Sequence, residues 1–429
     1  MWKYKCRSQL LSLILAFVAG FAMTFFLNSD EMFLEMMEGT LPNEVMSIFV
    51  SNPWIIGVSS GIGFMGLLNV FLLISLISVA NTGLLLMFAL IAIMMPDYAI
   101  MIGVLAIPVT LVLNIYGWVS LRMTEKKNLA KANIKGDDDI VRAFLEHHQL
   151  DPKYEAIANE AKASVKKINF ALVLGLIAEF CALFFFQNLI ISMILVFFCV
   201  MGIQYLQRIR AASLNNISAI LINECNPEGC LSALIYFGKK GNHYKLKNRA
   251  LCAQCLIYLN EPELAQQVLI EFPKSNVTNV MAYDSLMGYI YYMLKDEEGL
   301  NRVKNEMESV RAGTGSMMMM IKTEELGAIQ NRISLMKGDF NTCKKYYLNL
   351  LKRSVSNLQR SDCSYYIALI SFVQEDYVVA KMYFEKVLQT GNKLYFVNNA
   401  KNYLSKIENS PLLEHQQEEM NQPMNNQMF

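Results

Sequence analysis

Basic residues are missing from two long parts of this 429-residue chain. No Lys or Arg occurs between Arg7 and Arg122, and none occurs between Lys167 and Arg208. Uncharged apolar runs of this length are typical of membrane spans. Only 17% of the residues are charged while 54% are hydrophobic, and the net charge is +1. A nucleic-acid partner is therefore not expected, because it would require a strong basic excess.

Catalytic motifs are also missing. The sequence has no Gly-rich phosphate loop, no metal-spaced His/Glu motif and no nucleophile–base set. All four histidines lie outside the apolar runs, so no base accompanies the serines of GVSSGIGFMG at 57–66. We therefore expect no catalytic residue, no enzyme activity and no cofactor.

The apolar runs predict six transmembrane helices, because about 20 apolar residues cross a bilayer. Region 1–121 holds four of them, and 168–207 is expected to form a hairpin of two more. Turn signals at ANTG and PDY divide the first region. Its spans are expected at about 10–27, 54–79, 83–95 and 99–118. The first run also resembles a signal peptide, although no small-x-small cleavage site follows it.

The basic residues orient these spans. Segment 122–167 carries ten Lys or Arg and is expected in the cytoplasm, where positive charges concentrate. With an even number of spans on each side of this segment, both termini are expected in the cytoplasm as well. Short loops and the lack of a targeting extension favour a bacterial plasma membrane.

One acid, Glu179, lies deep within an apolar run. An ionisable group at membrane depth is a functional-site candidate, so a transporter or channel component using Glu179 is one hypothesis. The alternative is that Glu179 is protonated, or bonded to an amide such as Asn69 or Asn114, and serves packing. No Lys, Arg or His lies in a predicted span to pair with it.

Two further features are a pair of glycines in an apolar run and a triplet of acids in the segment that follows the first four spans. Gly57 and Gly61 have the small-xxx-small spacing that lets helices approach closely in lipid, which predicts helix packing or a homo-oligomer through the Gly57–Gly61 face. In the polar, helical segment 122–167, the triplet Asp137–Asp139 favours a solvated helix start over a cation site. A second helix is expected to begin at Asp151.

Pairs of amphipathic helices separated by polar turns follow the membrane part. The best example is CSYYIALISFV-QED-YVVAKMYFEKVL, at 363–388. Equivalent positions in successive second helices are 231, 265, 301, 343 and 380, which are 34, 36, 42 and 37 residues apart. Helix–turn–helix units of about 34 residues are typical of tetratricopeptide repeats.

Region 210–408 therefore resembles the tetratricopeptide-repeat family. Ala368 and Ala380 fill its small-residue positions and Phe384 its aromatic one, although the family's tryptophan and closing proline are missing. The resemblance implies an α-hairpin solenoid that binds a protein partner and ends in a capping helix. The alternative is an array that only supports an oligomer of the membrane domain. The tail 409–429, rich in Gln, Asn and Met, is expected to be disordered.

The cysteines and the methionine run are better explained by helix packing than by a metal site. Two close thiol pairs superficially resemble a zinc site; they are Cys225, Cys230, Cys252 and Cys255. LCAQCLIYL lacks the turn that such a site requires, so buried thiols are favoured over metal ligands. Disulfides are not expected in the cytoplasm. Helix faces and core packing explain the MMMM run at 317–320.

These features together predict an all-α protein with a six-span bundle and a cytoplasmic solenoid. The expected function is a membrane-anchored scaffold or adaptor whose repeats bind a protein partner. Its other partner is the lipid bilayer.

Overall fold

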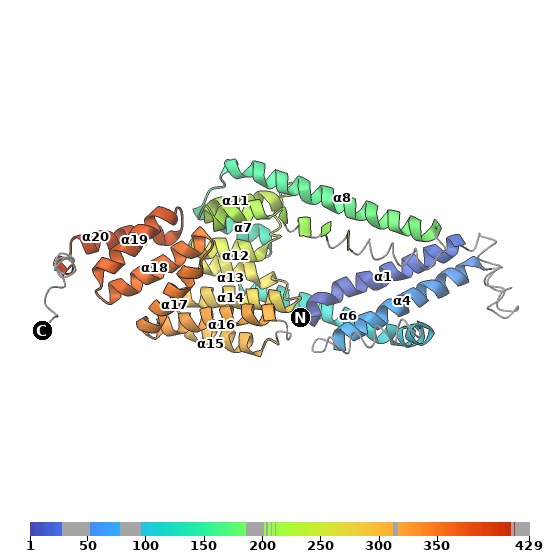
Figure 1. Ribbon diagram of the computed structural model, residues 1–429. Coiled ribbons are helices and arrows are strands. Elements are labelled where there is room, and N and C mark those ends of the chain that lie inside the picture. The colour runs from blue at the N-terminus through green and yellow to red at the C-terminus, as the bar shows by residue number, and fades with distance from the viewer. Residues whose placement is uncertain are drawn as a thin grey trace. The chain divides into compact units, whose positions relative to one another are not determined.

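The computed structural model describes residues 1–27, 52–77, 96–185, 201–202, 205–206, 208–210, 212–311, 316–412 and 416. Over these residues the chain is helical, with no strand and one isolated bridge between Lys240 and His243, which confirms the all-α prediction. The chain forms two compact units (Figure 1). Unit 1 is Met1–Asn128 with Pro273–Val280 and Arg311–Gly315, and unit 2 is Leu129–Phe272, Met281–Val310 and Ser316–Phe429.

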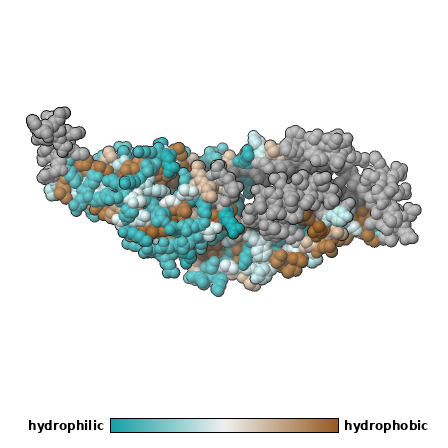
Figure 2. Space-filling model, turned by 60° about the horizontal axis from the view of Figure 1, so that its bottom comes forward, coloured by the Kyte–Doolittle hydropathy of each residue, from teal (hydrophilic) through white to brown (hydrophobic). Residues whose placement is uncertain are grey.

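Unit 1 contains three long helices: α1 (Trp2–Leu27), α4 (Pro53–Ile77) and most of α6 (Pro96–Lys131). Segments Trp2–Ala22 and Ile100–Lys131 are long and apolar enough to cross a membrane, and Trp54–Val70 is a shorter apolar helix. The predicted span 83–95 lies outside the described residues, as does most of the predicted hairpin beyond Phe185. The outward face of α6 is apolar, and brown atoms gather on unit 1 in Figure 2, whereas unit 2 is mostly teal.

Glycines set the spacing between α1 and α4. A Cβ atom built on Gly57 would lie 2.8 Å from the ring of Phe21, and one built on Gly61 would lie 2.9 Å from the ring of Phe17. The small-xxx-small face of α4 therefore packs against α1 of the same chain, because only a residue without a side chain leaves room for these rings. A homo-oligomer through Gly57–Gly61 stays a prediction, and it would have to form around or displace α1.

Helices α4 and α6 approach even more closely. A Cβ atom on Gly103 would overlap the carbonyl oxygen of Gly66. The side chain of Asn69 donates a hydrogen bond to the carbonyl oxygen of Gly103, at 2.9 Å. Backbone contact and one amide hydrogen bond therefore fix this crossing.

Unit 2 begins with α7 (Asp137–His147), the short helix η1 (Pro152–Tyr154) and α8 (Glu155–Phe185). The helices that follow are here called the array. They are α10 (Asn215–Ile222), α11 (Pro227–Gly238), α12 (Arg249–Tyr258), α13 (Pro262–Val268), η2 (Leu269–Glu271), α14 (Val277–Met293), α15 (Glu297–Ser309), α16 (Ser316–Met336), α17 (Phe340–Arg353), α18 (Asn357–Val373), α19 (Tyr377–Thr390) and α20 (Tyr395–Glu408).

One kind of turn joins the two helices of each pair in the array. A residue with positive φ ends the first helix, and these residues are Cys225, Asn260, Lys295, Gly338 and Glu375. The next residue is the N-cap of the second helix. Four N-cap side chains accept a hydrogen bond from the N–H three residues later, namely Asn226, Asp296, Asp339 and Asp376. Glu261 occupies the same place without a side-chain cap bond.

The N-caps define which residues are equivalent in successive pairs. Four residues after each N-cap, a side chain is completely buried, and these residues are Cys230, Ala265, Leu300, Cys343 and Ala380. Two of the predicted equivalent positions, 231 and 301, are therefore each one residue too late. The turn sets the register, and the inward-facing residue follows from it.

The first helices of the array are bonded to the start of α18 and to the loop before α20. The carbonyl oxygens of Asn223 and Glu224, at the end of α10, accept hydrogen bonds of 2.7 Å from the side chains of Asn357 and Asn392. The N–H of Lys393 donates to the carbonyl oxygen of Cys225 at 3.2 Å, and its ammonium group lies 3.2 Å from Glu228. These residues thus satisfy backbone groups that the end of a helix leaves open.

Candidate functional site

A pocket of about 430 Å³ opens on the array. It is lined by Asn260, Tyr292, Met293, Lys295, Leu335, Met336, Tyr365, Tyr366, Leu369 and Tyr395. These residues come from α14, α16, α18 and α20 and from the turns that follow α12 and α14. We call it the tyrosine pocket, because four of its ten lining side chains are tyrosines.

Helical spacing and the common turn place these side chains together. In α18, Asp362, Tyr366 and Leu369 recur at intervals of four and three residues and so share one helix face. Asn260 and Lys295 are the positive-φ residues of two successive turns, so they enter the pocket at equivalent places. The repeated helix–turn–helix arrangement therefore forms the pocket.

Stacked rings make the pocket wall rigid. Tyr366 stacks on Tyr347 with ring centroids 4.8 Å apart, and Tyr365 stacks on Phe396 at 4.6 Å. The ring of Tyr292 meets Tyr366 edge-on at 6.2 Å. Aromatic pairs at such distances stabilise beyond the area that they bury. The lining tyrosines are thus held in position before any ligand binds.

Charged groups lie behind the tyrosines. The hydroxyl of Tyr289 donates to a carboxylate oxygen of Asp362 at 3.1 Å and lies 3.2 Å from the hydroxyl of Tyr366. The guanidinium of Arg332 lies over the ring of Tyr289, 4.4 Å from its centroid. One guanidinium nitrogen of Arg332, Nη1, is buried without a hydrogen-bond partner in the described part of the chain.

The low polarity of this region shifts its titratable groups. Burial raises the pKa of Asp362 to about 6, although Arg332 and hydrogen bonds from tyrosines oppose the shift. Burial also raises the pKa of Tyr292 to about 12. The tyrosine hydroxyls therefore stay protonated at neutral pH and can donate hydrogen bonds.

The lining determines what the pocket can bind. Tyrosine, leucine and methionine side chains offer an apolar surface with hydroxyl donors, and Lys295 adds a positive charge. No acid lines the pocket among the described residues. An apolar side chain that carries an acidic neighbour fits this chemistry, because large apolar groups anchor in pockets and an adjacent charge fixes their orientation.

The acidic triplet has a different role from the solvated start predicted for it. Asp137 lies 2.6 Å from Arg249, which also pairs with Glu271. Asp138 accepts a hydrogen bond of 2.6 Å from the N–H of Tyr244 and lies 2.8 Å from the ring of His243. These two contacts hold the pKa of Asp138 below its usual value. The triplet thus fastens α7 to the segment before α12.

Further contacts attach the segment between α6 and α8 to the array. The side-chain amide of Asn226 donates to the hydroxyl of Tyr154 at 2.8 Å, and the N–H of Asp151 donates to Ser232 at 3.2 Å. Asp151 also caps η1. The segment packs as part of unit 2, and its sequence pattern does not reveal these partners.

The four candidate thiols are buried. Burial raises the pKa of Cys225 to about 11 and also raises the pKa of Cys252 and Cys255. The thiol of Cys230 lies 3.2 Å from the carbonyl oxygen of Ile217. Among the described residues, no group of three or more His, Cys, Asp and Glu side chains is arranged to hold a metal ion.

Glu179 belongs to α8, but its side chain lies outside the described residues. Comparison of the chain with protein-family models, with curated proteins and with solved structures finds no match. The tyrosine pocket was not predicted from the sequence. Its only signal in the sequence is the richness of the first helices in tyrosine, as in MGYIYYML and CSYYIALISFV.

Proposed function

We propose that the protein is a membrane-anchored interaction module. Its array is an α-hairpin solenoid resembling tetratricopeptide repeats, and it binds a segment of a protein partner in the tyrosine pocket. The apolar helices of residues 1–121 and 168–207 anchor the array in a bilayer, with the array and both termini in the cytoplasm. The role is that of a scaffold or adaptor without enzymatic activity.

The pocket supports this proposal most strongly. Its rings are fixed by stacking, so a ligand loses little of its binding energy to ordering the site. Its lining combines apolar surface, hydroxyl donors and the charge of Lys295, which fits an apolar side chain beside an acidic residue. Repeated polar turns, with Asn260 and Lys295 at equivalent places, provide polar contacts along the same segment.

Site-specific photocrosslinking in cells tests the proposal. A benzophenone amino acid replaces Met336, which lines the pocket, and in a matched chain it replaces Met382, which is 44% exposed and outside the pocket. We expect discrete protein adducts from position 336 that Lys295→Glu abolishes, because the new charge repels an acidic ligand. Equal adducts from both positions, or adducts unaffected by Lys295→Glu, would contradict binding in the pocket.

A second function, transport, is favoured by buried amides in unit 1. Asn114 is 1% exposed, and neither its nitrogen nor its oxygen has a hydrogen-bond partner in the described residues. The side-chain oxygens of Gln9 and Asn69 share this state. Buried polar groups at membrane depth are costly and often functional. The test measures ion flux into vesicles that contain the full chain. Flux that Glu179→Gln and Asn114→Leu lower would favour transport. The absence of flux would exclude it.

A further inference from the structure

The N-terminal end of α16 exposes a group of methionines. Met317, Met319 and Met320 are 71%, 51% and 58% exposed. The other exposed large apolar residues in the described part of the array stand singly: Val355, Val373 and Met382. Helix faces and core packing are the explanations expected for the MMMM run, and three of its four residues lie on an exposed helix face. We call these three exposed residues the methionine end. Clustered exposed apolar side chains mark an interaction surface, whereas single ones do not.

The methionine end belongs to an extension of α16 that the first helices of the neighbouring pairs lack. Helix α16 has 21 residues, whereas α14 and α18, the first helices of the neighbouring pairs, have 17 each. The ammonium group of Lys322 donates to the carbonyl oxygens of Glu308 and Val310, at 2.7 and 2.8 Å. These bonds attach the base of the extension to the end of α15. The exposed methionines therefore sit on a fixed helical support.

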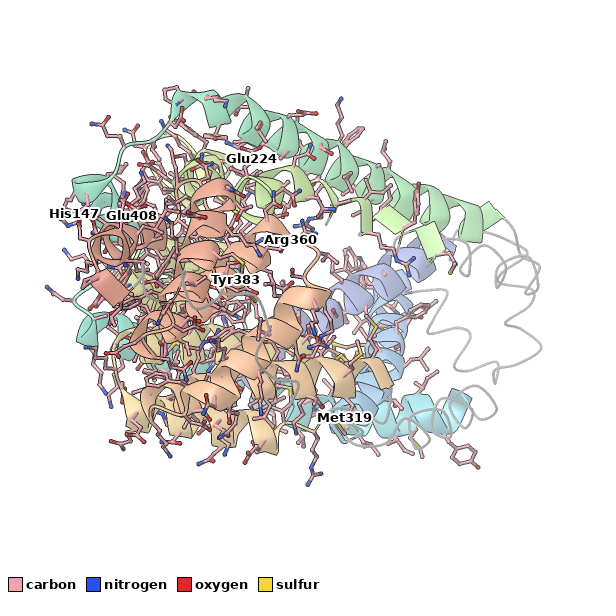
Figure 3. All side chains as sticks on the ribbon, turned by 60° about the vertical axis from the view of Figure 1, so that its left-hand side comes forward. His147, Glu224, Met319, Arg360, Tyr383 and Glu408 are labelled. Atoms are coloured by element: carbon pink, nitrogen blue, oxygen red, sulfur yellow. The ribbon has the colours of Figure 1, made fainter. Side chains whose placement is uncertain are left out.

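The direction of the extension matches that of α8. Both helices belong to unit 2, and in Figures 1 and 3 the N-terminal end of α16, marked by Met319 in Figure 3, projects to the same side as the far end of α8. Along α8, Lys166 and Lys167 precede an apolar stretch in which Phe170 and Val173 are 65% and 55% exposed. Lysines followed by exposed apolar residues are typical of the level at which a helix enters a bilayer.

We infer that the methionine end rests in the surface of the bilayer that anchors α8. The inference depends on the proposed membrane attachment. Methionine side chains are apolar, unbranched and flexible, so they can enter the boundary between head groups and acyl chains without a shaped pocket. The occupant is phospholipid, because the methionine end projects to the same side as the far end of α8, which carries exposed apolar residues of its own.

Photocrosslinking to lipid tests the inference in the full chain. The chain is reconstituted in phosphatidylcholine–phosphatidylglycerol vesicles that contain a radiolabelled phospholipid. A benzophenone amino acid is placed at 319, at 382 as an exposed control in the same array, or at 173 as a control on α8. We expect labelled lipid on chains modified at 319 and 173, and severalfold less on chains modified at 382.

Three results would overturn the inference, and they differ in what they say of the proposed anchor. Lipid adducts at 173 but not at 319 would refute the methionine end while preserving the anchor. Adducts at neither position would refute both. An adduct between 319 and another protein chain, with no lipid adduct, would show that the methionine end is a protein interface.

Discussion

Unit 1 and the array are both built of helices, but different chemistry holds them together. In unit 1 the helices meet where glycine faces a ring or another backbone, as Gly57 does with Phe21 and Gly103 with Gly66. In the array, side-chain caps fix four of the five turns within pairs, and tyrosine side chains fill the space between pairs. Close backbone approach suits lipid, where apolar side chains gain little from burial, whereas the array gains from removing rings from water.

The largest effect is expected from adding a side chain at the glycine crossing. Gly103→Val places atoms where the carbonyl oxygen of Gly66 lies, so α4 and α6 must separate, at a cost of about 3 kcal/mol. The midpoint of thermal unfolding of the full chain in detergent measures it. Gly63→Ala is the matched control, because the nearest atom to its Cβ would be 4.0 Å away. Equal stability of both variants would show that backbone contact does not hold unit 1.

An intermediate effect is expected from the acid behind the tyrosine pocket. Asp362 has a pKa of about 6 in the folded chain, above the value of about 3.9 in unfolded peptides. The folded state therefore binds the proton more tightly, and stability falls as pH rises from about 4 to about 6, by on the order of 2 kcal/mol. Above pH 6 this contribution is constant.

Asp362→Asn should remove that pH dependence and stabilise α18 at pH 7, because an amide oxygen can still accept from Tyr289. Amide hydrogen exchange of α18 in the full chain, at several pH values, measures the local free energy of opening. Asp339→Asn, at an exposed N-cap, serves as the control. The same slope between pH 4 and 6 in the Asp362→Asn variant would mean that another group titrates there.

The smallest effect is expected at the turns. Asp376→Ala removes the cap bond to the N–H of Val379 and should destabilise α19 by about 1 kcal/mol. The reverse change is available at Glu261, whose side chain makes no cap bond. Glu261→Asp should stabilise α13 by a smaller amount, and hydrogen exchange of each helix reports both. The free energy of opening should fall for α19 and rise for α13. Changes in the same direction would show that the cap bond does not determine the stability of these helices.

Local signals in the sequence located the helices and turns of the array well. NEP, KDEE, KGD and QED each contain the N-cap residue that the structure shows, because caps and left-handed residues have strong local preferences. The register of the inward-facing positions was missed by one residue at 231 and 301. In both cases the buried residue, Cys230 or Leu300, directly precedes the predicted one, and the approximate turn positions read from the sequence did not choose between these neighbours.

Contacts between distant segments left no such signal. Tyr289 and Asp362 are separated by 73 residues, and Asp137 and Arg249 by 112. Each of these residues also fits a plain helix face or helix start, so a single sequence offers no reason to pair them. The tyrosine pocket and the docking of α7 therefore emerge only from the three-dimensional arrangement. The role of Glu179 stays a prediction.

The bonds from the end of α10 to the start of α18 and to the loop before α20 also affect how the array unfolds. Linear repeat proteins unravel from a terminal repeat, which has a neighbour on one side alone. Here Asn357, the first residue of α18, and Asn392, in the loop before α20, donate to the carbonyl oxygens of Asn223 and Glu224, so the first helix of the array gains a second neighbour. Fraying from α10 must therefore also break its bonds to α18 and to the loop before α20. A partner that pulls on α10 therefore also pulls on α18, which is distant in the sequence.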